Sequence, residues 1–234
     1  MREALFIGTD ETSAGPFNIQ IPLAGLHQLQ NSGNSALCDG SGSLFMGRFC
    51  LMTAGAPCYS TAAPNLDPKQ RLFLLTHLSL YLRTNAEKTG LGLHLGEALK
   101  HIGSPLRLPR DLSGFVHSLL GRGQGLTPSG DDFLVGVMAV LPYKSLANEV
   151  VRQSQCEGAT GIVSRAFFHA AAERHFNEDI CLMLDAAVKL DQALLFRLFE
   201  RIKGFGHSSG LDLLAGMHFG LRFLLRTVPC DTRS

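Results

Sequence analysis

Short apolar runs separated by turn residues fill the first quarter of the chain. ALFIG, FNIQIPL and SLFMGRFCLM are each bounded by glycine, proline or serine. Apolar runs of this length between turn signals are typical of β-strands. The pattern therefore predicts a β-rich N-terminal part over residues 1–64.

The apolar period lengthens to that of a helix after Pro64. Asp67 followed by Pro68 is typical of a helix start, and the periodic run continues to about residue 88. Further helices are expected at about 93–102, 110–120, 131–141, 159–174, 178–189, 191–202 and 211–226. The expected fold class is α+β, with the small β-rich part packed on a mainly helical body over residues 65–234.

Two segments of the helical part resemble each other at a constant offset of 80 residues. TPSGDDFLVGVM (127–138) aligns with HSSGLDLLAGMH (207–218). The identical pairs are Ser129 with Ser209, Gly130 with Gly210, Asp132 with Asp212, Leu134 with Leu214, and Gly136 with Gly216. This similarity suggests an internal pseudo-repeat. Gly136 and Gly216 each weaken a helix, so we expect them to allow the two repeated helices to pack closely.

The repeated Ser-x-x-Asp pattern has a structural interpretation. Ser129 with Asp132, and Ser209 with Asp212, each match a capping box at a helix start. Such a cap stabilises a protein by roughly 1 kcal/mol and requires no ligand.

The same segments also have a functional interpretation. Glycines at 121, 123 and 125 let the backbone approach a ligand, and free amides at a helix start favour anions. Two facing helix starts would form one pocket with Arg122 and His207 at its rim, and Thr160 and Ser164, one turn apart, could face it. Adjacent Asp131 and Asp132 disfavour a bare phosphate, so we expect that one carboxylate is tied up in the cap, or binds an N–H or cationic group, or that Mg²⁺ mediates. A ligand with an anionic end and an amide end would use the amides and a carboxylate together.

Composition and charge exclude several other classes. Lys and Arg number 21 against 20 Asp and Glu, without a basic run, so nucleic acid is not an expected partner. The N-terminus lacks a signal-peptide pattern, and no apolar run reaches the roughly 20 residues of a membrane span. We therefore expect a cytoplasmic protein without membrane contact. The six cysteines form no CxxC pair, so we expect free, mostly buried thiols, and no metal site is predicted on His or Cys.

Other familiar enzyme motifs do not fit this chain. GHSSG (206–210) has the spelling of a nucleophile elbow, but helix rather than strand is expected before it. No P-loop pattern occurs, and GLGLHLG (90–96) lacks the spacing of a dinucleotide-binding turn.

The two Gly-Ser-Asp motifs resemble a known family. GLTPSGDDFLVG (125–136) and GHSSGLDLLAG (206–216) are similar to the signature of the AllH-like family of oxamate carbamoyltransferase subunits. TGIVSRAFFHAA (160–171) and GPFNIQI (15–21) resemble further parts of that family. The resemblance implies carbamoyl transfer between carbamoyl phosphate and oxamate in allantoin breakdown, within a complex of several subunits or a homo-oligomer.

The resemblance and the spacing together give the candidate site residues. The candidates for catalysis are Asp131, Asp132, His207 and Asp212. The candidates for substrate binding are Arg122, Gly123, Gly125, Thr127, Ser129, Gly130, Thr160, Ser164, Ser208, Ser209 and Gly210. Two other classes of function remain open: a non-catalytic assembly subunit, and a stand-alone enzyme or sensor for another small anion such as a nucleotide.

Overall fold

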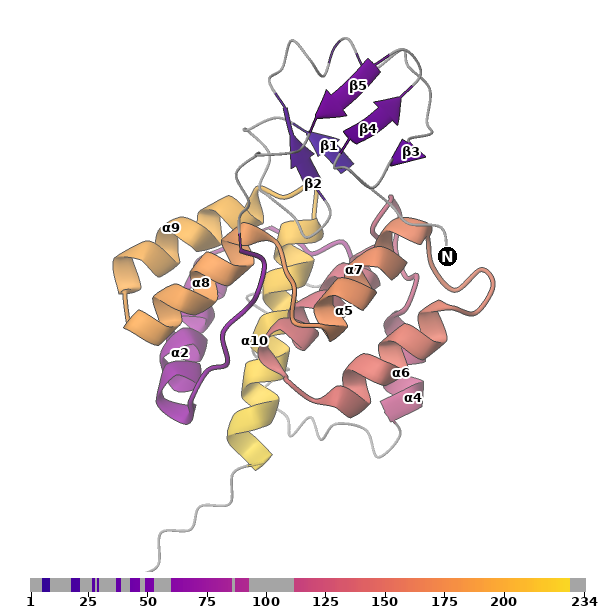
Figure 1. The fold of residues 1–234 in the computed structure, drawn as a ribbon. Coiled ribbons are helices and arrows are strands. Elements are labelled where there is room, and N and C mark those ends of the chain that lie inside the picture. Colours follow the sequence, from indigo (N-terminus) through magenta and orange to yellow (C-terminus); the bar gives the residue numbers. More distant parts are fainter. Residues whose placement is uncertain are drawn as a thin grey trace, which may run out of the picture.

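The computed structural model describes residues 6–8, 18–21, 27, 29, 37–38, 43–46, 49–52, 60–85, 87–92 and 112–227. The helices in these ranges are α2 (Pro68–Thr84), α4 (Leu112–Leu119), α5 (Ser129–Val140), α6 (Lys144–Ser154), α7 (Ile162–Ala172), α8 (Glu178–Lys189), α9 (Gln192–Lys203) and α10 (Ser209–Thr227). The strands are β1 (Phe6–Gly8), β2 (Asn18–Gln20), β3 (Leu37–Cys38), β4 (Ser43–Met46) and β5 (Phe49–Met52). The chain is mostly helical, with two small sheets, in loose agreement with the expected α+β class (Figure 1).

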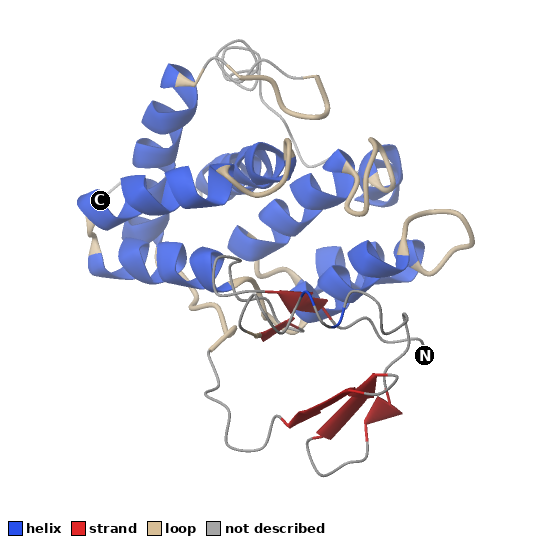
Figure 2. Cartoon of the chain, turned by 90° about the horizontal axis from the view of Figure 1, so that it is seen from above, coloured by secondary structure: helices blue, strands red, loops and turns tan. Residues whose placement is uncertain are grey.

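All the strands named above except β3 come from the predicted apolar runs of the first quarter. β1 and β2 pair in parallel, and β3, β4 and β5 form an antiparallel sheet in that order. SLFMGRFCLM contains two strands, β4 and β5, which pair with each other. Figure 2 shows the three-stranded sheet apart from the helices, while β1 and β2 overlap the helical body in that view. A domain boundary near residue 64 stays a prediction.

The start of α2 agrees with its predicted capping signal. Oδ1 of Asp67 accepts from the Gln70 amide at 2.8 Å, and Oε1 of Gln70 accepts from the Asp67 amide at 2.8 Å. Pro68 is the first helical residue. The helix ends at Thr84, earlier than predicted, because Asn85 adopts an extended conformation at φ −91° and ψ 118°.

One helix was not predicted. α6 places Leu146, Val150 and Ser154 on its buried side at four-residue intervals, and Leu146 is 1% exposed. The predicted helix at 93–102 lies outside the described residues, and the other predicted helices are observed with ends shifted by a few residues at most.

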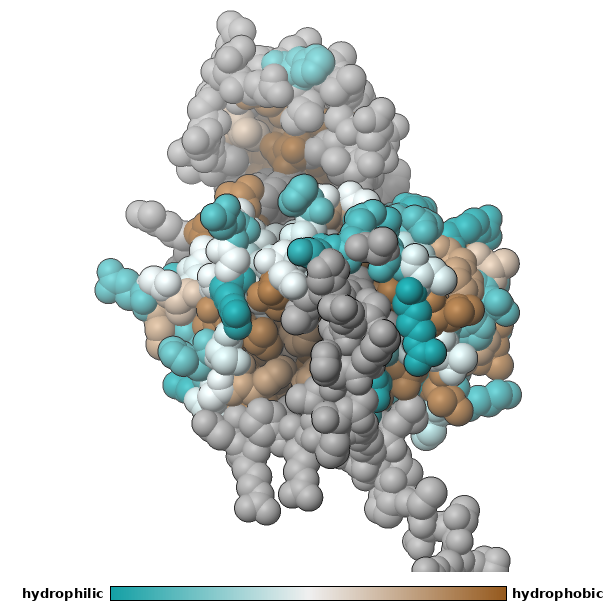
Figure 3. Space-filling model, turned by 180° about the vertical axis from the view of Figure 1, so that it is seen from behind, coloured by the Kyte–Doolittle hydropathy of each residue, from teal (hydrophilic) through white to brown (hydrophobic). Residues whose placement is uncertain are grey.

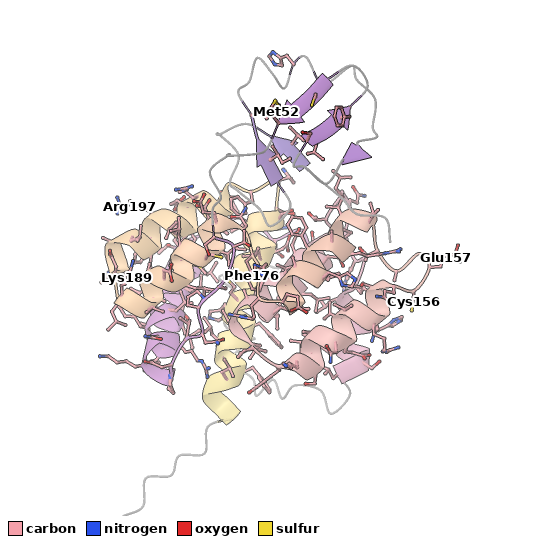
Figure 4. The ribbon with its side chains drawn as sticks, viewed as in Figure 1. Met52, Cys156, Glu157, Phe176, Lys189 and Arg197 are labelled. Atoms are coloured by element: carbon pink, nitrogen blue, oxygen red, sulfur yellow. The ribbon has the colours of Figure 1, made fainter. Side chains whose placement is uncertain are left out.

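α10 forms the centre of the helical body (Figure 1). Every residue from 210 to 221 is buried, and α5 beside it is buried over almost its whole length. Phe176, between α7 and α8, is 2% exposed and lies in the interior in Figure 4. Burial of this apolar surface is the main force that stabilises the body.

α5 and α10 touch each other through their backbones. A Cβ placed on Gly136 would lie 2.9 Å from the carbonyl carbon of Leu213, and one on Gly216 would lie 2.8 Å from that of Phe133. The expected close packing of the repeated helices is therefore confirmed. These two contacts are related by the same offset of 80 residues, while a duplication of whole halves stays a prediction.

The surface mixes polar and apolar side chains. Figure 3 shows both kinds interspersed over the helical body as seen from behind. The expectation of buried thiols is wrong for Cys50 and Cys156, which are exposed free thiols, and is confirmed for Cys181, which is buried. Cys156 and Glu157 lie at the outer edge of the body, after α6 (Figure 4). Within the described ranges, no helix has both the length and the apolar character needed to cross a membrane.

Candidate functional site

The glycine-rich loop before α5 approaches the helix start closely. Gly123 has a φ of +118°, a conformation that favours glycine. A Cβ on this residue would lie 2.7 Å from the backbone nitrogen of Ser129. The loop is thus folded against the first residue of α5, while its approach to a ligand stays a prediction.

The predicted capping box at the start of α5 is wrong. The helix begins at Ser129 with Pro128 as its N-cap, and no side chain caps it. The Pro128 carbonyl accepts from the amides of Asp131 and Asp132 at 2.8 and 3.1 Å. α10 likewise begins at Ser209, and the Ser208 carbonyl accepts from the Asp212 amide at 2.9 Å. Both repeated serines therefore lie inside the first turn, where their side chains can reach the other helix.

Asp131 accepts hydrogen bonds from the loop before α5 and from the segment before α7. It is 1% exposed, and its Oδ1 accepts from the Gly121 amide at 2.7 Å. Its Oδ2 accepts from the hydroxyl of Thr160. Both carboxylate oxygens thus have partners within the chain, which gives Asp131 a structural task.

Asp132 and Asp212 bring the two motifs together. Thr127 Oγ1 lies 3.4 Å from Ser209 Oγ, so the residues before α5 touch the start of α10. The hydroxyls of Ser209 and Thr127 interact with Asp132, and those of Ser129 and Ser208 interact with Asp212. Each carboxyl group therefore meets the serine of the other motif, and the two contacts exchange under the offset of 80 residues. We call these six residues the Ser-Asp cluster.

Burial weakens the acidity of both carboxyl groups, and neighbouring negative charges add to this effect at Asp132. Burial raises the pKa of Asp132 to about 7, the hydroxyls of Ser209 and Thr127 oppose this rise, and the negative charges of Asp212 and Asp131 add to it. Burial also raises the pKa of Asp212, against the stabilising amide of Gly90 and the nearby hydroxyls. Asp132 is therefore able to exchange a proton near neutral pH, as general acids and bases do.

A segment that sequence reasoning did not select completes the cluster. The Gly90 amide donates to Oδ2 of Asp212 at 3.1 Å, and the Leu91 amide also stabilises this carboxylate. A Cβ on Gly90 would collide with the hydroxyls of Ser129 and Ser208 and lie 2.9 Å from Asp212 Oδ2. The only signal in the sequence was a glycine-rich stretch, which gives no indication of a partner 122 residues away.

The remaining candidates differ in their contacts and in their exposure. Gly130 and Gly210 contact the ends of the preceding helices: a Cβ on either would lie 2.8 Å from the carbonyl carbon of Leu119 or Ile202. Ser164 is 1% exposed, and its Oγ has no hydrogen-bond partner among the described residues. The exposed candidates are Arg122, Gly123, Gly125 and His207. No group of three or more His, Cys, Asp and Glu side chains that could hold a metal ion occurs in the described ranges.

The segment that carries the Ser-Asp cluster matches a known family. Residues 119–221 match the family model of the oxamate carbamoyltransferase subunit AllH. This match confirms the resemblance seen in the two Gly-Ser-Asp motifs. The AllH match includes α5 and most of α10, and begins after Gly90 and Leu91. No solved structure matches the chain.

Proposed function

We propose that the chain is a subunit of a carbamoyltransferase and binds a small substrate, with an anionic and an amide end, at the paired starts of α5 and α10. One observation carries this proposal: the Ser-Asp cluster joins two carboxyl groups and four hydroxyls from both motifs, inside the segment that matches AllH. Such preorganised polar groups at a mostly buried site suit a reaction in which charge develops on a carbonyl.

The reaction is carbamoyl transfer between carbamoyl phosphate and oxamate. The oxamate nitrogen bonds to the carbamoyl carbon, the bond from that carbon to the phosphate oxygen breaks, and the nitrogen loses a proton. Asp132 accepts this proton, because a pKa of about 7 suits a general base at neutral pH. Backbone amides of the loop residues 123–127 hold the anionic end, and Asp131 positions that loop through Gly121.

Two exposed residues, a metal ion and further subunits also take part in the proposed reaction. His207 precedes α10 and assists proton movement, and Arg122 attracts the anionic substrate from the surface. Mg²⁺ would be coordinated by the phosphate oxygens of carbamoyl phosphate. The complex contains further subunits or copies of this chain and acts in the cytoplasm, in the breakdown of allantoin from purines.

A non-catalytic assembly subunit is the second candidate. The packing glycines favour it, because Gly130, Gly136, Gly210 and Gly216 all make backbone contacts that hold helices together. In this case the motifs serve only to join α5 and α10, and the catalytic groups lie on another chain.

Thermal unfolding in the presence of ligands tests the proposal. The purified chain is heated with carbamoyl phosphate, oxamate, phosphate or ADP, each with and without Mg²⁺. A ligand at a hundred times its dissociation constant stabilises by about 2.7 kcal/mol, which raises the midpoint by roughly 2–4 °C per kcal/mol for a chain of this size. We expect carbamoyl phosphate or oxamate to raise it, and Ser209→Ala to reduce this rise. A rise with ADP alone favours a nucleotide-binding protein, and no rise with any compound favours the assembly subunit.

A further inference from the structure

The two halves of the Ser-Asp cluster differ in one respect. Each half has a carboxyl group and two hydroxyls, but among the described residues only those at Gly90 and Leu91 add backbone amides, and they do so to the Asp212 half. In the Asp132 half, the buried Oδ2 accepts no hydrogen bond from any described residue. The Asp212 half therefore shows which chemical group this motif binds: an amide N–H that donates to the carboxylate between two hydroxyls.

We propose that the two motif copies are not equivalent: the chain's own backbone at Gly90 and Leu91 occupies the Asp212 copy except for its Oδ1, and the Asp132 copy, together with that oxygen, accepts the N–H donors of a ligand's primary amide. This assignment rests on the proposed function only for the choice of substrate. It makes Asp132 the residue that distinguishes an amide from a carboxylate, and makes Asp212 the anchor of residues 89–91.

Two unpartnered oxygens support a primary amide as the ligand group. Asp212 is fully buried, and its Oδ1 has no hydrogen-bond partner among the described residues, as is true of Oδ2 of Asp132. Buried carboxylate oxygens without partners are costly, so a bound donor group would stabilise them. The nitrogen of a primary amide carries two N–H donors, which matches one acceptor oxygen from each motif.

Charge at the cluster argues against a carboxylate or phosphate in this position. The charged groups that act on Asp132 are Asp212, from α10, and Asp131, from its own helix, and both are acidic. An anionic end placed beside them would be repelled, so it must lie toward the backbone amides of the loop. The amide end then points to Asp132.

Oxamate and oxalate form a matched pair of probes for this assignment, because oxalate replaces the amide of oxamate with a carboxylate of similar shape. Their affinities are measured by calorimetry at pH 8 on the wild-type chain, on Asp132→Asn and on Asp179→Asn. Asp179 is the control, since it is a buried aspartate in the first turn of α8 that pairs with Arg201 at 2.7 Å. We expect the wild type and the control to prefer oxamate by about tenfold or more, and Asp132→Asn to lose this preference.

The pH dependence of the wild-type preference gives a second measurement that needs no variant. A carboxylate accepts N–H donors more strongly than a carboxylic acid does, and its charge repels oxalate, so the ratio of oxamate to oxalate affinity should rise as pH increases from 6 to 8, through the pKa of Asp132 near 7. Thermal unfolding of each variant checks that it is folded.

The two proposals fail in different ways. Equal affinity for oxamate and oxalate in the wild type, or an unchanged preference in folded Asp132→Asn, would overturn the assignment of the amide to Asp132. A clear oxamate preference without carbamoyl transfer by the complete assembly would leave this assignment standing and reject the proposed function.

Discussion

At pH 8, the Asp132→Asn variant is expected to unfold at a higher temperature than the wild type. The pKa of Asp132 is about 7 in the folded chain, against about 3.9 for an unfolded aspartate. Below pH 4 both states hold the proton, and between pH 4 and 7 only the folded state keeps it. Stability contributed by the protonated group is therefore lost as pH rises through this window, by on the order of 4 kcal/mol at most.

Asparagine removes this loss because it carries no charge at any pH. We expect the unfolding midpoint to rise by several degrees at pH 8, with about 16 °C as an upper limit, and to change little at pH 4. Differential scanning calorimetry at both pH values measures the effect. Asp179→Asn should instead lower the midpoint at pH 8, because it breaks the ion pair with Arg201. A lower midpoint for Asp132→Asn at pH 8 would indicate that Asp132 stabilises the fold as a charged residue.

The rate of carbamoyl transfer should fall in Asp132→Asn, although its unfolding midpoint rises. Loss of a general base costs about 100-fold or more in rate, so we expect the more stable Asp132→Asn assembly to be nearly inactive. Gains in stability combined with losses in activity are typical of active-site residues. An Asp132→Asn assembly that keeps its rate would exclude Asp132 from the reaction.

The second large effect is expected at the contact between α5 and α10. Gly136→Ala would place its Cβ 3.0 Å from the Met217 nitrogen and in collision with the Leu213 carbonyl. These are backbone atoms, so the two helices must separate, at a cost that exceeds the roughly 1 kcal/mol gained from alanine in a helix. We expect a net loss of about 2 kcal/mol and a midpoint lower by about 4 to 8 °C. Gly216→Ala should behave in the same way.

Gly220→Ala is the control for both substitutions, because Gly220 lies one turn after Gly216 on α10 and also faces α5. Its Cβ would meet the Cγ2 methyl of Val140 at 2.7 Å and the Leu141 side chain at 3.3 Å, and side chains can rotate away. The midpoint of this variant should therefore change less than that of Gly136→Ala. If both variants lose stability equally, backbone contact is not what makes the interface sensitive.

Local signals in the sequence predicted most of the helical part. α8 occupies Glu178–Lys189, the range expected from its apolar period, and Asp67 caps α2 as predicted. α6 was missed because its few apolar residues lie among charged and polar ones, so that burial of Leu146 and Val150 becomes evident only when the other helices are in place.

The candidate site was predicted in its residues but not in its connections. Ser129 and Asp132 fit a capping box, yet Pro128 takes the cap position and both side chains join the Ser-Asp cluster. The adjacent residues Asp131 and Asp132 could not be separated, because only tertiary contacts show that Asp131 binds Gly121 and Thr160. The part played by Gly90 depends on Asp212, at a distance in sequence that no local pattern reports.

The central position of α10 has a consequence for biosynthesis. The helix that fills the middle of the body is the last of the described elements to leave the ribosome, and contacts between distant segments form slowly. Until α10 emerges, α5 presents an apolar face without its partner, and such surfaces promote aggregation of nascent chains. The Ser-Asp cluster, which needs Ser208, Ser209 and Asp212, cannot exist before that moment, so a stalled or shortened translation product would lack the site entirely.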